Sequence, residues 1–133
     1  MRVFFDTNAL VSAFATRGLC ADLLHAVLAE HRLILGEAVL AEVRRVLRLK
    51  LGLTPALVEE VEALLREQAV IVTDAPRLEV DIRDPADLVI LSEAVAGEAD
   101  VLVTGDRDLL DTAAESPVPV VTPRGLWEKL RTE

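Results

Sequence analysis

The sequence opens with Arg2-Val3-Phe4-Phe5-Asp6-Thr7-Asn8-Ala9-Leu10, and this stretch decides the fold. The β-branched and aromatic residues before Asp6 predict a short strand, so Asp6 follows at the carboxyl end of that strand. Thr7 and Asn8 are residues of the type that caps helices, and the apolar run after them begins a helix. Open α/β sheets place their ligand sites at the carboxyl ends of strands, which makes Asp6 a candidate site residue.

Short apolar runs alternate with helical patterns along the rest of the chain. Further strands are expected at residues 33–35, 69–72, 101–103 and 118–121. Gly36 is expected to let the chain turn after the second strand, and Pro119 places the last strand at an edge because it lacks a hydrogen-bond donor. This alternation predicts a mostly parallel sheet with helices on both faces.

Length and composition limit the function classes. The 133 residues are expected to form one domain, 1–133, whose core the 52% apolar residues can fill. A net charge of −9 argues against binding nucleic acid by bulk charge, but not against a local basic patch with bound cations. The single cysteine, Cys20, excludes an internal disulfide and a cysteine-rich zinc site. Interrupted apolar runs and the lack of a signal peptide predict a cytoplasmic protein without membrane contact.

Four acids from separate segments are expected at one edge of the sheet. Asp6 follows the first strand, and Asp106 follows the fourth. Asp87 lies in the first turn of the helix before the fourth strand, and Glu42 lies in the early turns of the helix after the second, beside its apolar stripe. If the first and fourth strands are neighbours, the topological switch point lies between Asp6 and Asp106.

This set of side chains favours particular metals. Oxygen ligands without histidine or cysteine suit Mg²⁺ or Mn²⁺. Crowded carboxylates raise one another's pKa values unless a cation is present. One or two such ions would polarise a phosphate, activate a water and stabilise the leaving oxygen. The residues therefore predict a divalent-metal phosphoesterase.

Each acid also has a purely structural interpretation. Asp6 and Asp106 stand where an aspartate can cap a helix, and Glu42 could be a solvated helix charge. Asp84 and Asp87 form a cap and first-turn pair, of which we assign Asp84 to the cap and Asp87 to the site. The functional interpretation depends on four independent segments directing acids to the same edge.

Five motifs resemble those of the PIN-domain family of metal-dependent ribonucleases, in particular its bacterial branch of toxins from toxin–antitoxin pairs. The motifs are Val3–Ala13, Ala41–Leu47, Arg83–Asp87, Val103–Leu110 and Thr122–Arg124. The likeness covers essentially the whole chain in the family's order, and its first and last acidic motifs are the most specific. The branch often has acids at positions 86 and 88, where this chain has alanine and leucine.

The resemblance implies a three-layer α/β/α fold with a parallel five-stranded sheet of order 3-2-1-4-5. It implies cleavage of single-stranded RNA with an activated water, an antitoxin protein as a partner, and a homodimer. It also implies roles for particular residues: Asp6, Glu42, Asp87 and Asp106 as catalytic ligands of Mg²⁺ or Mn²⁺, Asp108 as an accessory metal-binding acid, and Asn8 and Thr104 as polar supports.

An acidic protein needs local positive charge to approach RNA. Basic residues follow Glu42 on its helix, and another stands between two acids near the fourth strand. We expect contacts with backbone phosphates from Arg44, Arg45, Arg48, Lys50 and Arg107. The structural alternative is a solvated helix face paired with Glu59 and Glu62.

Two other function classes stay open. A phosphohydrolase that forms an aspartyl-phosphate would need a second aspartate two residues after Asp6, where the chain has Asn8. It would also favour a lysine late in the sheet, and neither Lys50 nor Lys129 is expected there. A non-catalytic binding module would keep the PIN fold for its partner alone. The presence of all four acids favours the enzyme.

Overall fold

Five parallel strands form the centre of the molecule, in the order β3-β2-β1-β4-β5. The computed structural model describes residues 1–132. Its strands are β1 Arg2–Phe5, β2 Arg32–Gly36, β3 Val70–Val72, β4 Val101–Val103 and β5 Val120–Val121. The parallel pairing and the strand order confirm the expected three-layer α/β/α fold, with β5 at an edge.

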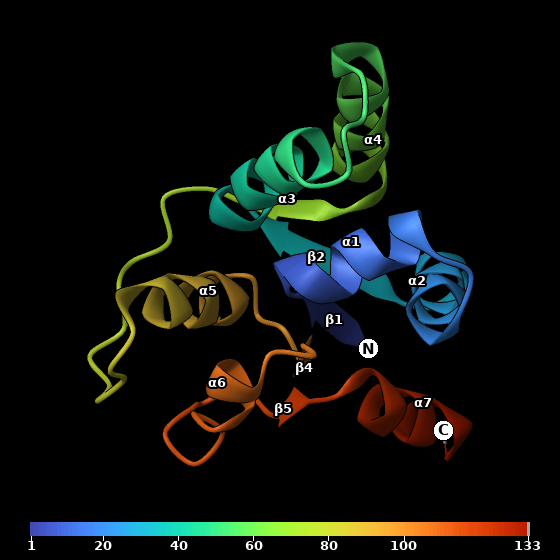
Figure 1. Cartoon of the computed structure of the whole chain (residues 1–133). Coiled ribbons are helices and arrows are strands. Elements are labelled where there is room, and N and C mark those ends of the chain that lie inside the picture. The colour runs from blue at the N-terminus through green and yellow to red at the C-terminus, as the bar shows by residue number, and fades with distance from the viewer. Residues whose placement is uncertain (133) are drawn as a thin grey trace.

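The described residues form seven helices, which connect and cover the strands (Figure 1). These are α1 Thr7–Ala15, α2 Leu19–Glu30, α3 Glu37–Leu49, α4 Pro55–Gln68, α5 Pro85–Ala96, α6 Arg107–Leu110 and α7 Pro123–Arg131. Figure 1 shows α3 and α4 together beyond β2, and α6, β5 and α7 on the other side of β1. Within residues 1–132 no single helix is long and apolar enough to cross a membrane. Helices α1 and α2 reach that length and apolar character only together, and the pair is bent by 101°.

Three helices begin at the cap and proline pairs in the sequence. The side chains of Thr54, Asp84 and Thr122 each accept a hydrogen bond from a backbone N–H in the first turn that follows. A proline occupies the first position of each helix, where its missing N–H has no helical partner to lose. The cap at Asp84, three residues before Asp87, fixes the start of α5.

The two central strands are buried on both faces. The three residues from Val3 to Phe5 in β1 and the three in β4 are at most 1% exposed. Such double burial explains why both strands are uninterrupted apolar runs. Phe4 pairs with Leu102 across the β1–β4 register, and Phe5 pairs with Val103. The residues that follow these strands, Asp6 and Thr104, are therefore neighbours at one edge.

Gly36 ends β2, but no unusual backbone turn requires a glycine there. Its φ of −115° is an angle that any residue adopts, so the expectation of a glycine turn is wrong. A Cβ at Gly36 would instead lie 1.9 Å from Cδ of Glu93, on α5. The glycine is needed because the Glu93 side chain occupies the space beside it.

Candidate active site

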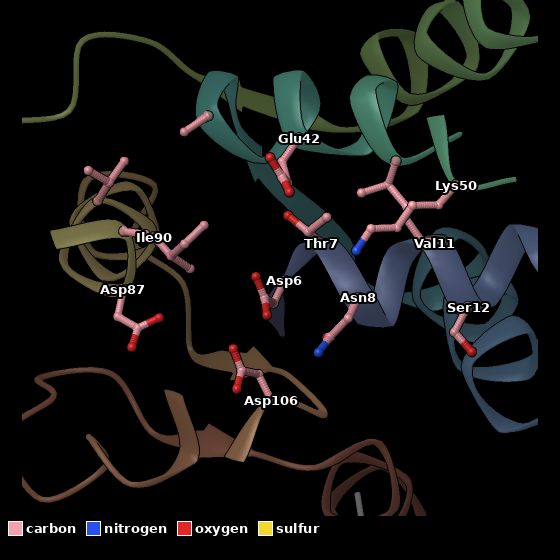
Figure 2. Close-up of a pocket in the computed structure, with 14 residues that line it drawn as sticks. Asp6, Thr7, Asn8, Val11, Ser12, Glu42, Lys50, Asp87, Ile90 and Asp106 are labelled. Carbon is pink, nitrogen blue, oxygen red and sulfur yellow. The ribbon is translucent and has the colours of Figure 1, made fainter. Parts of the chain in front are cut away.

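A cleft of about 700 Å³ opens at the carboxyl edge of the central strands. Its wall contains all four acids that the sequence assigned to this edge, and Figure 2 shows them around one space. Asp6 comes from the end of β1, Glu42 from α3, Asp87 from α5, and Asp106 from the end of β4. Valine and isoleucine side chains from α1, α3 and α5 form the apolar part of the wall.

Thr104 connects the two acids that follow the central strands. Its hydroxyl donates a hydrogen bond of 2.8 Å to Oδ2 of Asp6 and accepts one of 2.9 Å from the Asp106 N–H. Thr104 is fully buried and Asp6 is 7% exposed, so water competes little with these bonds. Burial raises the pKa of Asp6, and the hydrogen bond from Thr104 opposes that rise.

The capping interpretation holds for one of these two acids. Asp6 occupies the N-cap position of α1, which begins at Thr7, yet its side chain makes no capping hydrogen bond within the described chain. That interpretation of Asp6 is wrong. Asp106 does cap a helix, because its Oδ1 accepts a hydrogen bond of 3.0 Å from the Asp108 N–H. Asp106 therefore caps α6 and lines the cleft at the same time.

Among the acids of the cleft, Asp87 has the pKa that is raised furthest above its ordinary value. It is 8% exposed, in the first turn of α5, while Asp84 accepts the capping hydrogen bond from the Ala86 N–H. Burial raises the pKa of Asp87 to about 6, with further contributions from the negative charges of Asp84 and Asp106. A cation in the cleft would favour the ionised form of Asp87.

A single ridge of α3 faces the cleft. The ridge contains Ala38, Glu42, Val46 and Lys50, four residues apart in each case. Side chains at this spacing lie along one side of a helix, so the spacing was a signal in the sequence for the place of Lys50. Lys50 thus lines the cleft beside the acids, on the helix where phosphate contacts are expected.

Glu42 is held by an arginine of its own helix. Nη2 and Nε of Arg45 donate hydrogen bonds of 2.6 and 3.1 Å to the two carboxylate oxygens of Glu42. These hydrogen bonds lower the pKa of Glu42, so its carboxylate stays ionised below the ordinary range. Arg45 and Glu42 are both well exposed, and such a pair contributes little to stability.

The other predicted residues divide between the cleft and its surroundings. Asn8 lines the cleft, and its Oδ1 accepts a hydrogen bond of 3.3 Å from the Gly105 N–H. Asp108 lies in a neighbouring acidic cleft of about 530 Å³, which shares Asp87 with the first. Sequence reasoning missed two hydroxyl residues of the wall, Thr7 and Ser12, for which the chain carries no distinct signal.

Among the predicted arginines, one matches the structural alternative. Arg44 forms an ion pair of 3.1 Å with Glu62 of α4, as that alternative expected. Together with Arg45 and Arg48, it also lines a shallow groove on α3 beside the cleft. Arg107 is exposed at the start of α6.

The four carboxylates of the cleft are chemically suited to bind a hard divalent cation. All four acids offer carboxylate oxygens, which Mg²⁺ and Mn²⁺ prefer. Across residues 1–132, however, no three His, Cys, Asp or Glu side chains converge closely enough to hold an ion. Arg45 occupies both carboxylate oxygens of Glu42, so Glu42 would have to exchange this contact for a metal.

Comparisons with known proteins agree with this fold. The family model of the PIN domain matches residues 2–108. A structure of VapBC2 from Rickettsia felis, bound to a DNA fragment from their promoter, superposes with a TM-score of 0.65 at 16% identity, over 92% of this chain and 98% of that chain. The 2.2 Å structure of VapBC-1 from nontypeable Haemophilus influenzae gives 0.64 at 17% identity, over 93% and 99%. No curated protein sequence matches the chain. With the family model spanning most of its length, the chain belongs to the PIN-domain family.

Proposed function

We propose that this protein is a metal-dependent endonuclease for single-stranded RNA and the toxin of a toxin–antitoxin pair. The observation that carries the proposal is one cleft lined by carboxylates from four separate segments of the chain. Membership of the PIN-domain family supports the nuclease, and the likeness to the VapBC structures supports an antitoxin partner. Action on cellular RNA implies a cytoplasmic protein.

Asp6, Glu42, Asp87 and Asp106 would hold Mg²⁺ or Mn²⁺ in the cleft, with Asp108 as an accessory acid from the neighbouring cleft. When bound, such an ion polarises a phosphodiester and makes water a better nucleophile. The protein's own contribution is orientation. Thr104 fixes the carboxylate of Asp6, and the position of the Asp106 backbone depends on the same hydroxyl.

Positive charge beside the acids would guide the RNA backbone. Lys50 lies in the cleft itself, and Arg45 and Arg48 lie in the groove beside it. Cations at these places would bind phosphates on either side of the scissile bond. The apolar part of the wall, including Val46 and Ile90, offers a surface to an unstacked base, which only a single strand presents freely.

The test is cleavage of mixed single-stranded RNA with Mn²⁺ or Mg²⁺. Wild type, wild type with a chelator, Asp6→Asn and Asp22→Asn should be purified identically. Asp22 is an exposed acid on α2 that lines neither acidic cleft, so Asp22→Asn is the matched control. We expect cutting by wild type and the control, and a loss of about a hundredfold or more with the chelator or with Asp6→Asn.

The main alternative is a non-catalytic PIN-fold binding module. It draws support from the carboxylates of the described chain, which do not converge on one point. A folded wild type that binds Mn²⁺ but cuts no RNA would favour this alternative. Equal cutting by Asp6→Asn would show that the site assignment is wrong. A Mg²⁺-dependent phosphohydrolase would instead release phosphate from small phosphomonoesters and leave RNA intact.

A homodimer also belongs to the proposal. Exposed leucines gather at the end of α3 and on α4: Leu49 is 69% exposed, Leu51 43%, Leu57 47% and Leu64 44%. Leu57→Glu combined with Leu64→Glu should convert a dimer into a monomer in sedimentation experiments, since charge opposes burial of that face. A wild-type monomer at micromolar concentration would contradict this part of the proposal.

A further inference from the structure

Glu93 is buried on α5, but the proposed chemistry does not use it. This side chain is only 6% exposed. Its Oε2 accepts a hydrogen bond of 2.8 Å from the Ala38 N–H. This donor belongs to the first turn of α3. The N-cap residue of α3, Gly36, has no side chain that could accept it. Helix α3 is therefore capped by a residue from another helix.

Gly36 and Glu93 fit together sterically as well. A Cβ on Gly36 would lie 1.9 Å from Cδ and 2.0 Å from Oε1 of Glu93, so a larger residue at position 36 would displace the carboxylate. Oε1 accepts no hydrogen bond from residues 1–132. The positive end of the α3 dipole stabilises the negative charge at this place. This contact fixes α5 against the start of α3.

We propose that Glu93 is a positioning residue that sets the separation of two site acids, Glu42 on α3 and Asp87 on α5. The inference rests on the proposed metal site. Asp87 lies six residues from Glu93 along α5, which is roughly 9 Å, and Glu42 lies four residues from Ala38 along α3, which is roughly 6 Å. A rotation of about 10° at the contact would therefore move Asp87 by roughly 1.5 Å and Glu42 by roughly 1 Å. Mg²⁺ sites tolerate only about 0.2 Å in their ligand distances.

A pair of variants separates positioning from simple capping. Glu93→Ala removes both the cap of α3 and its connection to α5. Adding Gly36→Ser to Glu93→Ala supplies a local cap from position 36 itself, in the space that the glutamate leaves. The double variant thus restores the helix cap without the connection. Ser92→Ala is the matched control, because it removes from the same helix the hydroxyl that accepts a part-buried hydrogen bond from the Leu78 N–H.

Three measurements apply to each variant: the melting temperature, the Mn²⁺ affinity by titration calorimetry, and the distance between spin labels on α3 and α5. The labels go on Arg48→Cys and Ala96→Cys, both at exposed positions outside the main cleft, with Cys20→Ser to remove the native thiol. Glu93→Ala should lower the melting temperature by roughly 5 °C and weaken Mn²⁺ binding about tenfold or more. Ser92→Ala should lower the melting temperature and leave Mn²⁺ binding unchanged.

The double variant decides the question. Positioning predicts that it regains the melting temperature while Mn²⁺ binding stays weak and the label distance stays longer or broader than in wild type. Recovery of Mn²⁺ affinity together with the melting temperature would overturn the proposal, because Glu93 would then act only as a cap. If wild type binds no Mn²⁺, the proposed function fails, and the label distance still decides the role of Glu93. An unchanged distance in the double variant overturns that role, and a longer one supports it.

Discussion

Thr104 and Asp6 meet across the two central strands, where the Thr104 hydroxyl donates a hydrogen bond of 2.8 Å to Oδ2 of Asp6. Both side chains are buried, and the same hydroxyl accepts the Asp106 N–H. One threonine thereby fixes the acid that follows β1 relative to the acid that follows β4. This arrangement needs no ligand, so two of the four acids of the cleft, Asp6 and Asp106, are already held in position.

Thr104→Val keeps the shape of the side chain and removes the hydroxyl. It should cost about 1–3 kcal/mol of unfolding free energy, because a buried carboxylate and a backbone N–H lose their partner. The pKa of Asp6 should rise further, since the hydrogen bond that opposes the effect of burial is gone. Mn²⁺ titrations over a pH series should then show binding that begins at higher pH than in wild type. Thr112→Val, a partly buried threonine outside the main cleft, should leave this pH dependence unchanged.

Arg45→Ala should have opposite effects on two ligands. It releases Glu42 and removes a positive charge near the cleft, so Mn²⁺ should bind about two- to fivefold more tightly. It also removes a proposed phosphate contact, so RNA binding should weaken and its salt slope should fall by about 0.7. Arg66→Ala breaks a comparable pair with Glu37 away from the cleft and should change neither quantity. An unchanged salt slope in Arg45→Ala would remove this residue from the RNA surface.

The pKa of Asp87 predicts an unusual dependence of stability on pH. A folded-state value of about 6, above the ordinary 3.8, means that the folded chain holds a proton which the unfolded chain has already released. Without metal, Asp87 should therefore make the unfolding free energy fall by roughly 2 kcal/mol as pH rises from 4 to 6, and by less than about 0.5 kcal/mol above pH 6. Urea denaturation of wild type and Asp87→Asn measures this as a difference between two curves. Parallel curves over that range would show that the pKa of Asp87 is not raised.

Mn²⁺ binding should change with pH in the opposite direction. A divalent cation requires ionised Asp87, so its affinity should rise as pH increases through about 6 and then level off. Titration calorimetry from pH 5 to 8 checks this, and proton release should accompany binding at the lower end. Affinity that stays constant across this interval would place the metal away from Asp87.

Gly97→Ala tests the packing at the end of α5. A Cβ at this position would lie 2.5 Å from Cγ2 of Ile34 and 2.8 Å from Cγ2 of Val72. Overpacking of this kind should cost about 1–3 kcal/mol in chemical denaturation. Gly18→Ala is the control, because no atom lies within 4 Å of the added methyl group. Equal stability of the two variants would show that β2 and β3 adjust to the extra volume.

Much of the fold could be predicted because its signals are local. Continuous apolar runs such as Val101–Val103 mark strands that are buried on both faces, and the pair Thr54-Pro55 marks a helix start without reference to other segments. The four acids could be predicted for a related reason. In a parallel sheet the ends of strands and the starts of helices share one edge, so their position along the chain sets their place in space.

The missed features depend on distant partners. Glu93 lies in a helix of ordinary appearance, and its burial requires the missing side chain of Gly36, on a different strand. No pattern within α5 contains that information. Arg44 differs, because its pairing with Glu62 was one of the two interpretations of this helix face, and only the packing of α3 against α4 selects it. The contact between Glu42 and Arg45 is local, at a spacing of three residues, and could have been predicted.

The central position of β4 has a consequence for how the protein is made. Asp6 and Asp106 lie one hundred positions apart in the sequence, yet β1 and β4 are neighbours in the sheet. A growing chain folds from its N-terminal end, so β1 can pair with β2 and β3 before β4 has been synthesised. Until β4 takes its place, the acid that follows β1 has neither Thr104 nor Asp106 beside it. Under the proposed function, the protein would in this way stay inactive while the ribosome is still translating its own messenger.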